Sequence, residues 1–270
     1  MSHIDAALRD FNSLDALAAR TTALSALDPR AKILATLGFI VAVVSFDRYA
    51  VAALIPFALF PVLLAAVGDI PLRMIARKVL LASPFAFLMG MFNPLFDPNP
   101  LLELFGFAVA GGWVSFAAIL LRFALTVAAA VVLVGSTGLH QVCAGLRALR
   151  VPQVFTTQLL FLHRYAQVLA GEAARMSLAR ELRSPGGARL PLRVYGSLLG
   201  HLLLRAMERA QRIYQAMVAR GFDGQLRSIR PLRWRLVDSV FLVLCWSSFV
   251  LARQVDLAHL LGKLLMGNSL

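Results

Sequence analysis

The sequence predicts an all-α membrane protein, a polytopic helical bundle of about five transmembrane helices with two further long helices in the cytoplasm. Of its 270 residues, 59% are hydrophobic and the mean hydropathy is +0.75, which is too apolar for a soluble domain. Five apolar stretches are each long enough to be considered as membrane spans. Between Leu139 and Arg235, 16 arginines face only four acidic residues, a surplus of 12 out of the total net charge of +13. Such a block is typical of the cytoplasmic side.

The chain is expected to begin with a cytoplasmic lead over residues 1–30. This lead contains several aspartates, so it does not resemble a cleavable signal peptide. At its end, Asp28 precedes Pro29, a pair that favours a helix start. The first span is predicted to follow at 31–46, and residues 31–135 as a whole are expected to hold the first four transmembrane helices.

Prolines mark the second and third spans. The second is predicted at 49–67, where Pro56 and Pro61 should kink the helix, because each removes a backbone donor, or leave it packed inside protein. The third is predicted at 79–95, with Pro84 inside it. A fourth span, at 113–134, contains a single charge, and a fifth, at 236–251, lies in the C-terminal segment 234–270, whose tail is amphipathic.

Charges in the loops predict the orientation. A small basic loop before the third span and the large arginine block should be cytoplasmic, and a turn-rich acidic loop from Asp97 to Glu103 should be outside. With four spans before the arginine block, these loops require a cytoplasmic N-terminus. The residues of the basic loop are Arg73, Arg77 and Lys78.

The cytoplasmic region, 136–233, is predicted to hold one short amphipathic helix at 138–150 and two long helices. The first long helix should run over 153–182 and the second from about Pro191 to Ala219, each roughly 45 Å long. Both end on an arginine followed by residues that stop helices. The second helix has two stripes at helical spacing. Its apolar stripe is Leu192, Leu199, Leu203, Ala210, Tyr214 and Met217, and its basic stripe is Arg205, Arg209, Arg212 and Arg220.

Four sequence strings resemble the transmembrane coupling (T) component of energy-coupling-factor (ECF) importers, in particular the cobalt and nickel type known as CbiQ or NikQ. The resemblance covers essentially the whole chain. The strings are Leu27-Asp28-Pro29-Arg30-Ala31-Lys32, Phe161-Leu162-His163-Arg164-Tyr165, Glu172-Ala173-Ala174-Arg175-Met176 leading to Arg183, and Glu208-Arg209-Ala210 leading to Ala216-Met217-Val218-Ala219-Arg220-Gly221-Phe222.

The resemblance implies that the two long helices are coupling helices, each ending in an Ala-Arg-Gly-like motif that docks on one ATPase subunit. The second motif is intact as Ala219-Arg220-Gly221, whereas the first departs from the pattern and reads Leu182-Arg183-Ser184. A register centred on Arg180 stays open for the first motif. An arginine suits this role because its planar guanidinium can make several fixed hydrogen bonds to carboxylates or carbonyls. The residues expected to support the motifs are Glu172, Arg175, Arg180, Glu208, Arg209 and Arg212.

The resemblance also implies the partners. These are two cytoplasmic ABC ATPase subunits and a substrate-binding membrane subunit, with or without a small accessory membrane subunit, in the bacterial inner membrane. The sequence has no phosphate-binding Gly-x-x-x-x-Gly-Lys-Ser/Thr motif and its five histidines are scattered. ATP is therefore expected on the ATPases and Co²⁺ or Ni²⁺ on the substrate-binding subunit, with no cofactor on this chain. Nucleic acid is not an expected partner, since aromatic residues are not interleaved with the basic ones.

Two other functions are considered. The string Glu172-Ala173-Ala174 is similar to the coupling loop of ordinary ABC importer permeases, but that loop has Gly seven residues after the Glu, where this chain has Ala179. A membrane-embedded enzyme would need reactive residues in its spans. Only Arg122 and Asp238 are ionisable there, without paired carboxylates or a nucleophile motif, so the chain is expected not to be an enzyme.

Overall fold

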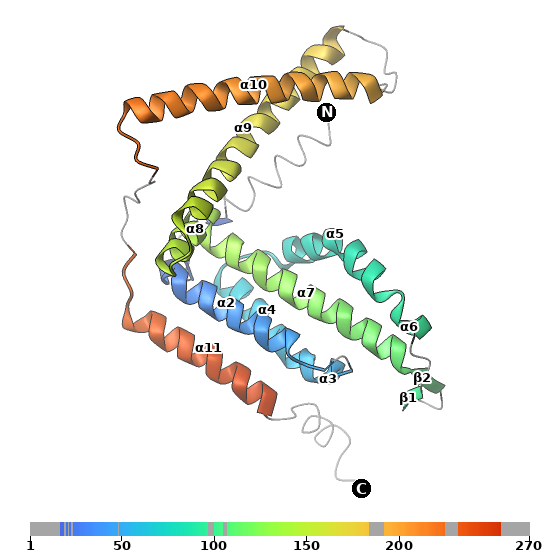
Figure 1. Ribbon diagram of the computed structural model, residues 1–270. Helices are drawn as coiled ribbons and strands as arrows, with labels where there is room; N and C mark the ends of the chain where they lie inside the picture. Colours follow the sequence, from blue (N-terminus) through green and yellow to red (C-terminus); the bar gives the residue numbers. More distant parts are fainter. Residues whose placement is uncertain are drawn as a thin grey trace. The chain divides into compact units, whose positions relative to one another are not determined.

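The computed structural model describes residues 17–18, 20, 22, 24–47, 49–96, 100–104, 107–183, 192–224 and 232–254. The chain divides into two compact units. One, called the bundle unit here, consists of the described residues within 17–138 and 232–254; the other, called the long-helix unit, consists of the described residues within Leu139–Pro231. Apart from one small hairpin, the regular structure of the described residues is helical (Figure 1), and the predicted all-α class is confirmed.

The bundle unit starts with a 3-10 turn, η1 (Leu24–Ala26), and helix α2 (Pro29–Val44). Asp28 caps α2: its carboxylate accepts a hydrogen bond from the backbone N–H of Arg30 at 2.9 Å, and Pro29 occupies the first helical position. Both features are typical helix starts, because a side-chain acceptor satisfies a free N–H and proline needs none. The predicted start signal is confirmed, and the helix begins two residues earlier than expected.

The second predicted span is broken. It consists of α3 (Val51–Leu54), the 3-10 turn η2 (Ile55–Ala58) and α4 (Leu59–Val67). Pro56 lies in the 3-10 turn, so the kink expected there is confirmed. Pro61 lies in the first turn of α4, where a missing N–H costs nothing, and it is buried, so of the two outcomes expected at this residue the packing inside protein is confirmed.

The third helix, α5 (Leu72–Gly90), is longer at its N-terminal end than predicted. The residues expected to form a basic loop, Arg73, Arg77 and Lys78, all lie within its first two turns. The loop prediction is wrong because charged residues with good helix propensity continue a helix beyond an apolar core. Pro84 lies inside the helix, as predicted.

The segment expected to be a turn-rich acidic loop is partly structured. After the short helix α6 (Asn93–Phe96), strands β1 (Pro100–Leu104) and β2 (Phe107–Ala110) pair antiparallel. Glu103 lies in β1, so that part of the loop prediction is corrected; Asp97 lies outside the described residues. Strand β2 contains Phe107 and Val109, residue types that favour extended backbone.

Helices α7 (Gly111–Thr137) and α11 (Leu236–Gln254) are each long and apolar enough to cross a membrane, and Val51–Val67 is a shorter apolar stretch. In the bundle unit, α7 contacts α5, α2, α3 and α4, and α11 packs on α2 (Figure 1). The guanidinium of Arg122, the one charge within the predicted fourth span, donates a hydrogen bond to the backbone carbonyl of Asp47. The amphipathic tail expected after α11 lies outside the described residues.

An aromatic core holds the bundle unit together. Phe39 of α2 is fully buried, stacks on Phe60 of α4 with ring centroids 4.6 Å apart, and contacts Phe249 of α11 at 5.6 Å. Such pairs add to the stabilisation from apolar burial. By contrast, many large apolar side chains point outward, including Leu80 and Leu81 of α5 at 72% and 77% exposed. This outward apolar surface suits a bundle surrounded by lipid rather than by water.

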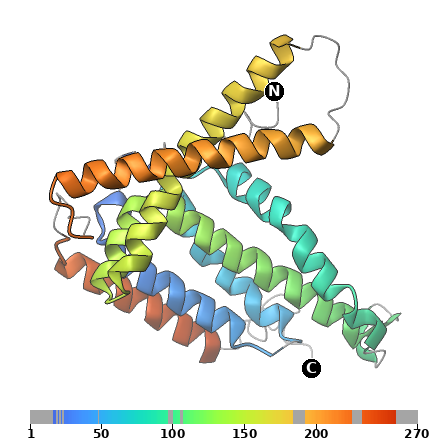
Figure 2. The same ribbon diagram turned by 45° about the horizontal axis from the view of Figure 1, so that its top comes forward.

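The long-helix unit contains α8 (Leu139–Ala148), α9 (Gln153–Arg183) and α10 (Leu192–Ala219). All three agree with the predicted helices to within a few residues at each end. Helix α8 packs on α9, and α9 and α10 cross each other, as both views show (Figures 1 and 2).

Candidate partner-coupling site

The end of α10 is a defined structural stop at the intact Ala-Arg-Gly motif. The N–H of Gly221 donates to the carbonyl of Val218 at 2.9 Å and that of Phe222 to the carbonyl of Met217 at 3.0 Å. Gly221 has φ +78°, a conformation that suits glycine because it lacks a Cβ. This is a Schellman C-cap in which Arg220 is the last residue before the reversal. The motif therefore places one exposed arginine at the point where the helix ends.

Helix α9 also ends on an arginine. Arg183 is its last residue and is exposed, whereas Arg180, the alternative first coupling residue, is half-buried in the last turn. Ser184, predicted as part of the first motif, lies outside the described residues. Within the described part of the chain, the guanidinium groups of Arg183 and Arg220 have no hydrogen-bond or ion-pair partner. Both guanidinium groups are thus open to another molecule.

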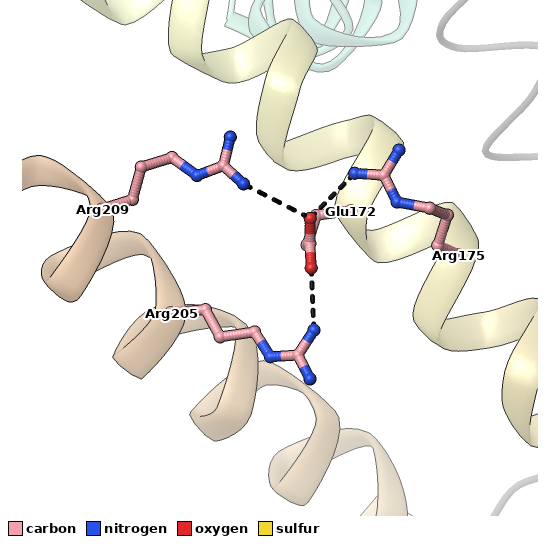
Figure 3. Close-up of polar contacts among 4 residues, drawn as sticks. All are labelled: Glu172, Arg175, Arg205 and Arg209. Atoms are coloured by element: carbon pink, nitrogen blue, oxygen red, sulfur yellow. Dashed lines mark hydrogen bonds and ion pairs between the residues drawn. The ribbon is translucent and has the colours of Figure 1, made fainter. Parts of the chain in front are cut away.

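Glu172 ties the two long helices together where they cross (Figure 3). One carboxylate oxygen accepts a hydrogen bond from Arg205 of α10 at 2.8 Å, and the other accepts one from Arg175 of α9 at 2.8 Å and lies 3.7 Å from Arg209 of α10. The Glu172 side chain is only 16% exposed. Hydrogen bonds from Arg175 and Arg205 hold the pKa of Glu172 below its usual value of 4.5, so this carboxylate is ionised at neutral pH.

The structure brings together three of the predicted supporting residues, Glu172, Arg175 and Arg209. It also adds Arg205, which was predicted only as a member of the basic stripe. The sequence signal for Arg205 is its spacing of four from Arg209, which places both on one face of α10. The other two supporting residues of α10, Glu208 and Arg212, form a separate exposed ion pair at 3.8 Å on the helix surface.

An apolar groove of about 730 Å³ lies between α9 and α10. Three apolar-stripe residues, Ala210, Tyr214 and Met217, line it from α10. Phe161 and Tyr165 line it from α9. Phe222 lines the same groove from beyond the helix end, so the C-cap and the groove are continuous. Tyr214 is 61% exposed. Large exposed apolar groups rimmed by arginines are typical of protein interaction sites.

Comparison with known proteins identifies the family. The family model described as "Cobalt transport protein", CbiQ, matches residues 20–231, which is most of the chain. The chain belongs to the CbiQ family. The match includes α2 through α10 and both candidate arginines, and ends before α11.

Two curated relatives of this CbiQ-family chain have names that state a transported metal. It is 32% identical to the nickel permease LarQ of Lactiplantibacillus plantarum over 44% of the chain and 45% of that protein. It is 36% identical to the cobalt transport protein CbiQ of Rhodobacter capsulatus over 37% of the chain and 43% of that protein. The chain therefore aligns with somewhat less than half the length of each relative. The family description names cobalt transport, and the family name agrees with the resemblance seen in the sequence.

The described residues of this CbiQ-family chain also show which chemistry its side chains can carry. Among them, no group of three or more His, Cys, Asp or Glu residues is arranged to hold a metal ion. The charged groups that gather between α9 and α10 are three arginines around one carboxylate. Any guanidinium N–H groups that Glu172 leaves free can bind only acceptors such as carboxylates or carbonyls, because guanidinium groups are donors only.

Proposed function

We propose that this chain is the transmembrane coupling subunit of an ECF-type ABC importer, linking ATP hydrolysis by two cytoplasmic ATPase subunits to movement of a substrate-binding membrane subunit. The observation that supports this most directly is the pair of exposed arginines, Arg183 and Arg220, at the ends of two long helices that Glu172 joins. The proposal places the chain in the bacterial inner membrane with its N-terminus and long helices in the cytoplasm, and it assigns no catalytic step to this chain.

The mechanism follows from the stiffness of the two helices. A change in spacing between two ATPases, each holding one arginine, would push or pull the helix ends. Because Arg205 and Arg209 both meet Glu172, the two helices would move as levers about a common crossing. The apolar groove beside the crossing, lined by Phe161 and Tyr214, would face the substrate-binding subunit. An accessory membrane subunit is compatible with this arrangement.

Cobalt is the cargo we propose, with nickel as the alternative. The family description names cobalt, whereas one of the two relatives is named a nickel permease. In this proposal, the substrate-binding subunit holds the metal ion and the ATPases hold ATP. No residue of this chain is assigned as a ligand of either.

The structure gives no support to an ordinary ABC permease. The string Glu172-Ala173-Ala174 lies in the middle of the continuous helix α9, and its carboxylate is already occupied by arginines of the same chain. A docking loop would instead need these residues to be free for an ATPase. A membrane enzyme is likewise not favoured by any described arrangement, since Arg122 and Asp238 are bound to backbone groups.

The test is co-purification of ATPase subunits with the chain carrying Arg183→Glu and Arg220→Glu. Reversing two docking charges should weaken ATPase binding by at least tenfold, because one lost buried arginine contact typically costs about 2–5 kcal/mol. The matched control is Arg150→Glu with Arg164→Glu, which makes the same change in net charge at exposed positions of the same unit. ATPase retention and metal uptake by the Arg183/Arg220 variant, once inserted normally, would contradict the proposal.

A further inference from the structure

Five polar residues of the bundle unit form a buried cluster that the proposed function has not used. We call this set the junction cluster. All of its members are at most 5% exposed, although polar and charged side chains are rarely buried so completely. Its members are Asp28, Lys32, Ser136, Thr137 and Asp238.

Asp238 joins the starts of two helices. One of its carboxylate oxygens accepts the backbone N–H of Asp28, the cap of α2, at 2.7 Å, and the other accepts the N–H of Arg235, just before α11, at 2.7 Å. Asp238 is 1% exposed and 210 residues away from Asp28 in sequence. Helix starts have backbone N–H groups without partners inside the helix, so they are good donors to a carboxylate. Because each oxygen of Asp238 accepts one such hydrogen bond, the side chain is held in one position.

Lys32 extends the cluster to a third helix. Its ammonium donates to the hydroxyl of Thr137, the last residue of α7, at 3.3 Å, and it lies in the electrostatic field of Asp238 and Asp28. The hydroxyl of Ser136 lies 3.5 Å from that of Thr137. With Arg30, whose guanidinium lies 3.9 Å from Asp28, the two positive and two negative charges cancel. The charges are thus balanced around the ends of α2, α7 and α11.

The cluster has a special position along the chain. The long-helix unit begins at Leu139, two residues after Thr137, and ends at Pro231, four residues before Arg235. The two backbone connections that lead from the long helices into the bundle unit are therefore fixed within a few residues by the same buried group of charges. Any displacement of the long helices that reaches the bundle through the backbone must pass one of these two points.

We propose that the junction cluster, with Asp238 and Lys32 as positioning residues, anchors both backbone connections so that movement of the long helices is transmitted to the bundle unit. This inference rests on the proposed coupling function and names where in the bundle the movement arrives. Without the cluster, the two backbone connections could move independently of each other. Motion of the ATPases would then bend the chain at these connections and would not displace the bundle unit. The arrangement predicts uncoupling rather than loss of ATPase binding, because Arg183 and Arg220 lie outside the cluster.

The experiment uses the complete complex purified through this chain and reconstituted in liposomes, with cobalt(II) as the transported probe. The quantity measured is cobalt transported per ATP hydrolysed. Asp238→Asn removes the charge and one of the two acceptor oxygens, and we expect the ratio to fall about tenfold while the ATPases stay bound. Thr137→Val, nearly the same size and without a hydroxyl, should lower the ratio by about threefold. Asp69→Asn, the same chemical change at an exposed turn, is the matched control and should leave the ratio unchanged.

Rescue separates a positioning role from a merely structural one. Thr137→Ser keeps the hydroxyl that Lys32 contacts, and it should restore the ratio that Thr137→Val lowers, although both variants change the packing of the site. If Asp238→Asn prevents assembly, the comparison of the two Thr137 variants still decides the question. A wild-type ratio in Thr137→Val overturns the inference. Failure of the wild-type complex to couple hydrolysis to uptake would overturn the proposed function and this inference with it.

Discussion

Glycine at position 221 shows how one residue decides where the coupling surface ends. Its φ of +78° allows the two hydrogen bonds that close α10, and these bonds turn the chain immediately after Arg220. A residue with a Cβ in this conformation is strained. In the Ala-Arg-Gly string, the glycine therefore provides the backbone geometry that ends the helix, and the arginine provides the charge at that end.

We predict that Gly221→Ala frays the end of α10 at a cost of about 1–2 kcal/mol, because the left-handed conformation disfavours a Cβ. Gly196→Ala, within the same helix, should instead stabilise it by about 1 kcal/mol, since a Cβ there meets nothing within 4 Å and alanine favours the helix. Hydrogen exchange of the α10 amides measures both changes. Equal protection of the helix end in wild type and Gly221→Ala would show that the C-cap does not hold it.

At the scale of elements, the crossing of α9 and α10 depends on one carboxylate. Glu172 binds Arg205 across the crossing and Arg175 on its own helix, with Arg209 nearby. Apolar contacts line one side of this crossing, but the groove there stays open. The angle between the helices is therefore expected to respond to the charge of Glu172 more than a closely packed helix pair would.

We predict that Glu172→Gln broadens the distance distribution between spin labels at Leu178 of α9 and Leu199 of α10, because a neutral amide is a weaker acceptor for three arginines. Glu208→Gln is the matched control. It removes an ion pair within α10 only, and it should leave the distribution unchanged. The role assigned to Glu172 at the crossing would be contradicted if Glu208→Gln also broadened the distance distribution, or if Glu172→Gln left it as narrow as in wild type.

The same measurement has a defined pH dependence. The folded-state pKa of Glu172 lies below 4.5, so its stabilising contribution is complete above that value and is lost as the pH falls through the lower folded pKa. The wild-type distribution should be constant from about pH 8 to about pH 5 and should broaden only in more acidic solution. Broadening near pH 6 would indicate that a histidine, rather than Glu172, controls the crossing.

At the scale of the whole molecule, the charge distribution predicts how the chain lies in the membrane. A cysteine replacing Leu182, near the end of α9, should react with an impermeant maleimide only from the cytoplasmic side, and one replacing Met91, after α5, only from outside. Both positions are exposed. The native Cys143 gives little background, because burial raises the pKa of its thiol. Labelling of both positions from the same side would contradict the predicted topology.

Much of the architecture was predictable from local signals. Apolar stretches located α2, α7 and α11, the Asp28-Pro29 pair predicted a helix start, and the Arg-Gly string predicted a helix end. The errors have local causes as well. Three basic residues were assigned to a loop although their propensity continues α5, and a turn-rich loop was expected where Glu103 lies in β1.

The sequence by itself determined the membrane class, the order of the helices, the concentration of arginine and the two arginines at the helix ends, since all of these depend on composition and on neighbours within a few residues. Only the tertiary structure decided that Arg205 meets Glu172 and that Asp238 meets Asp28. The physical reason is that these contacts join residues 33 and 210 positions apart, so they depend on how helices cross and pack, which no local pattern encodes.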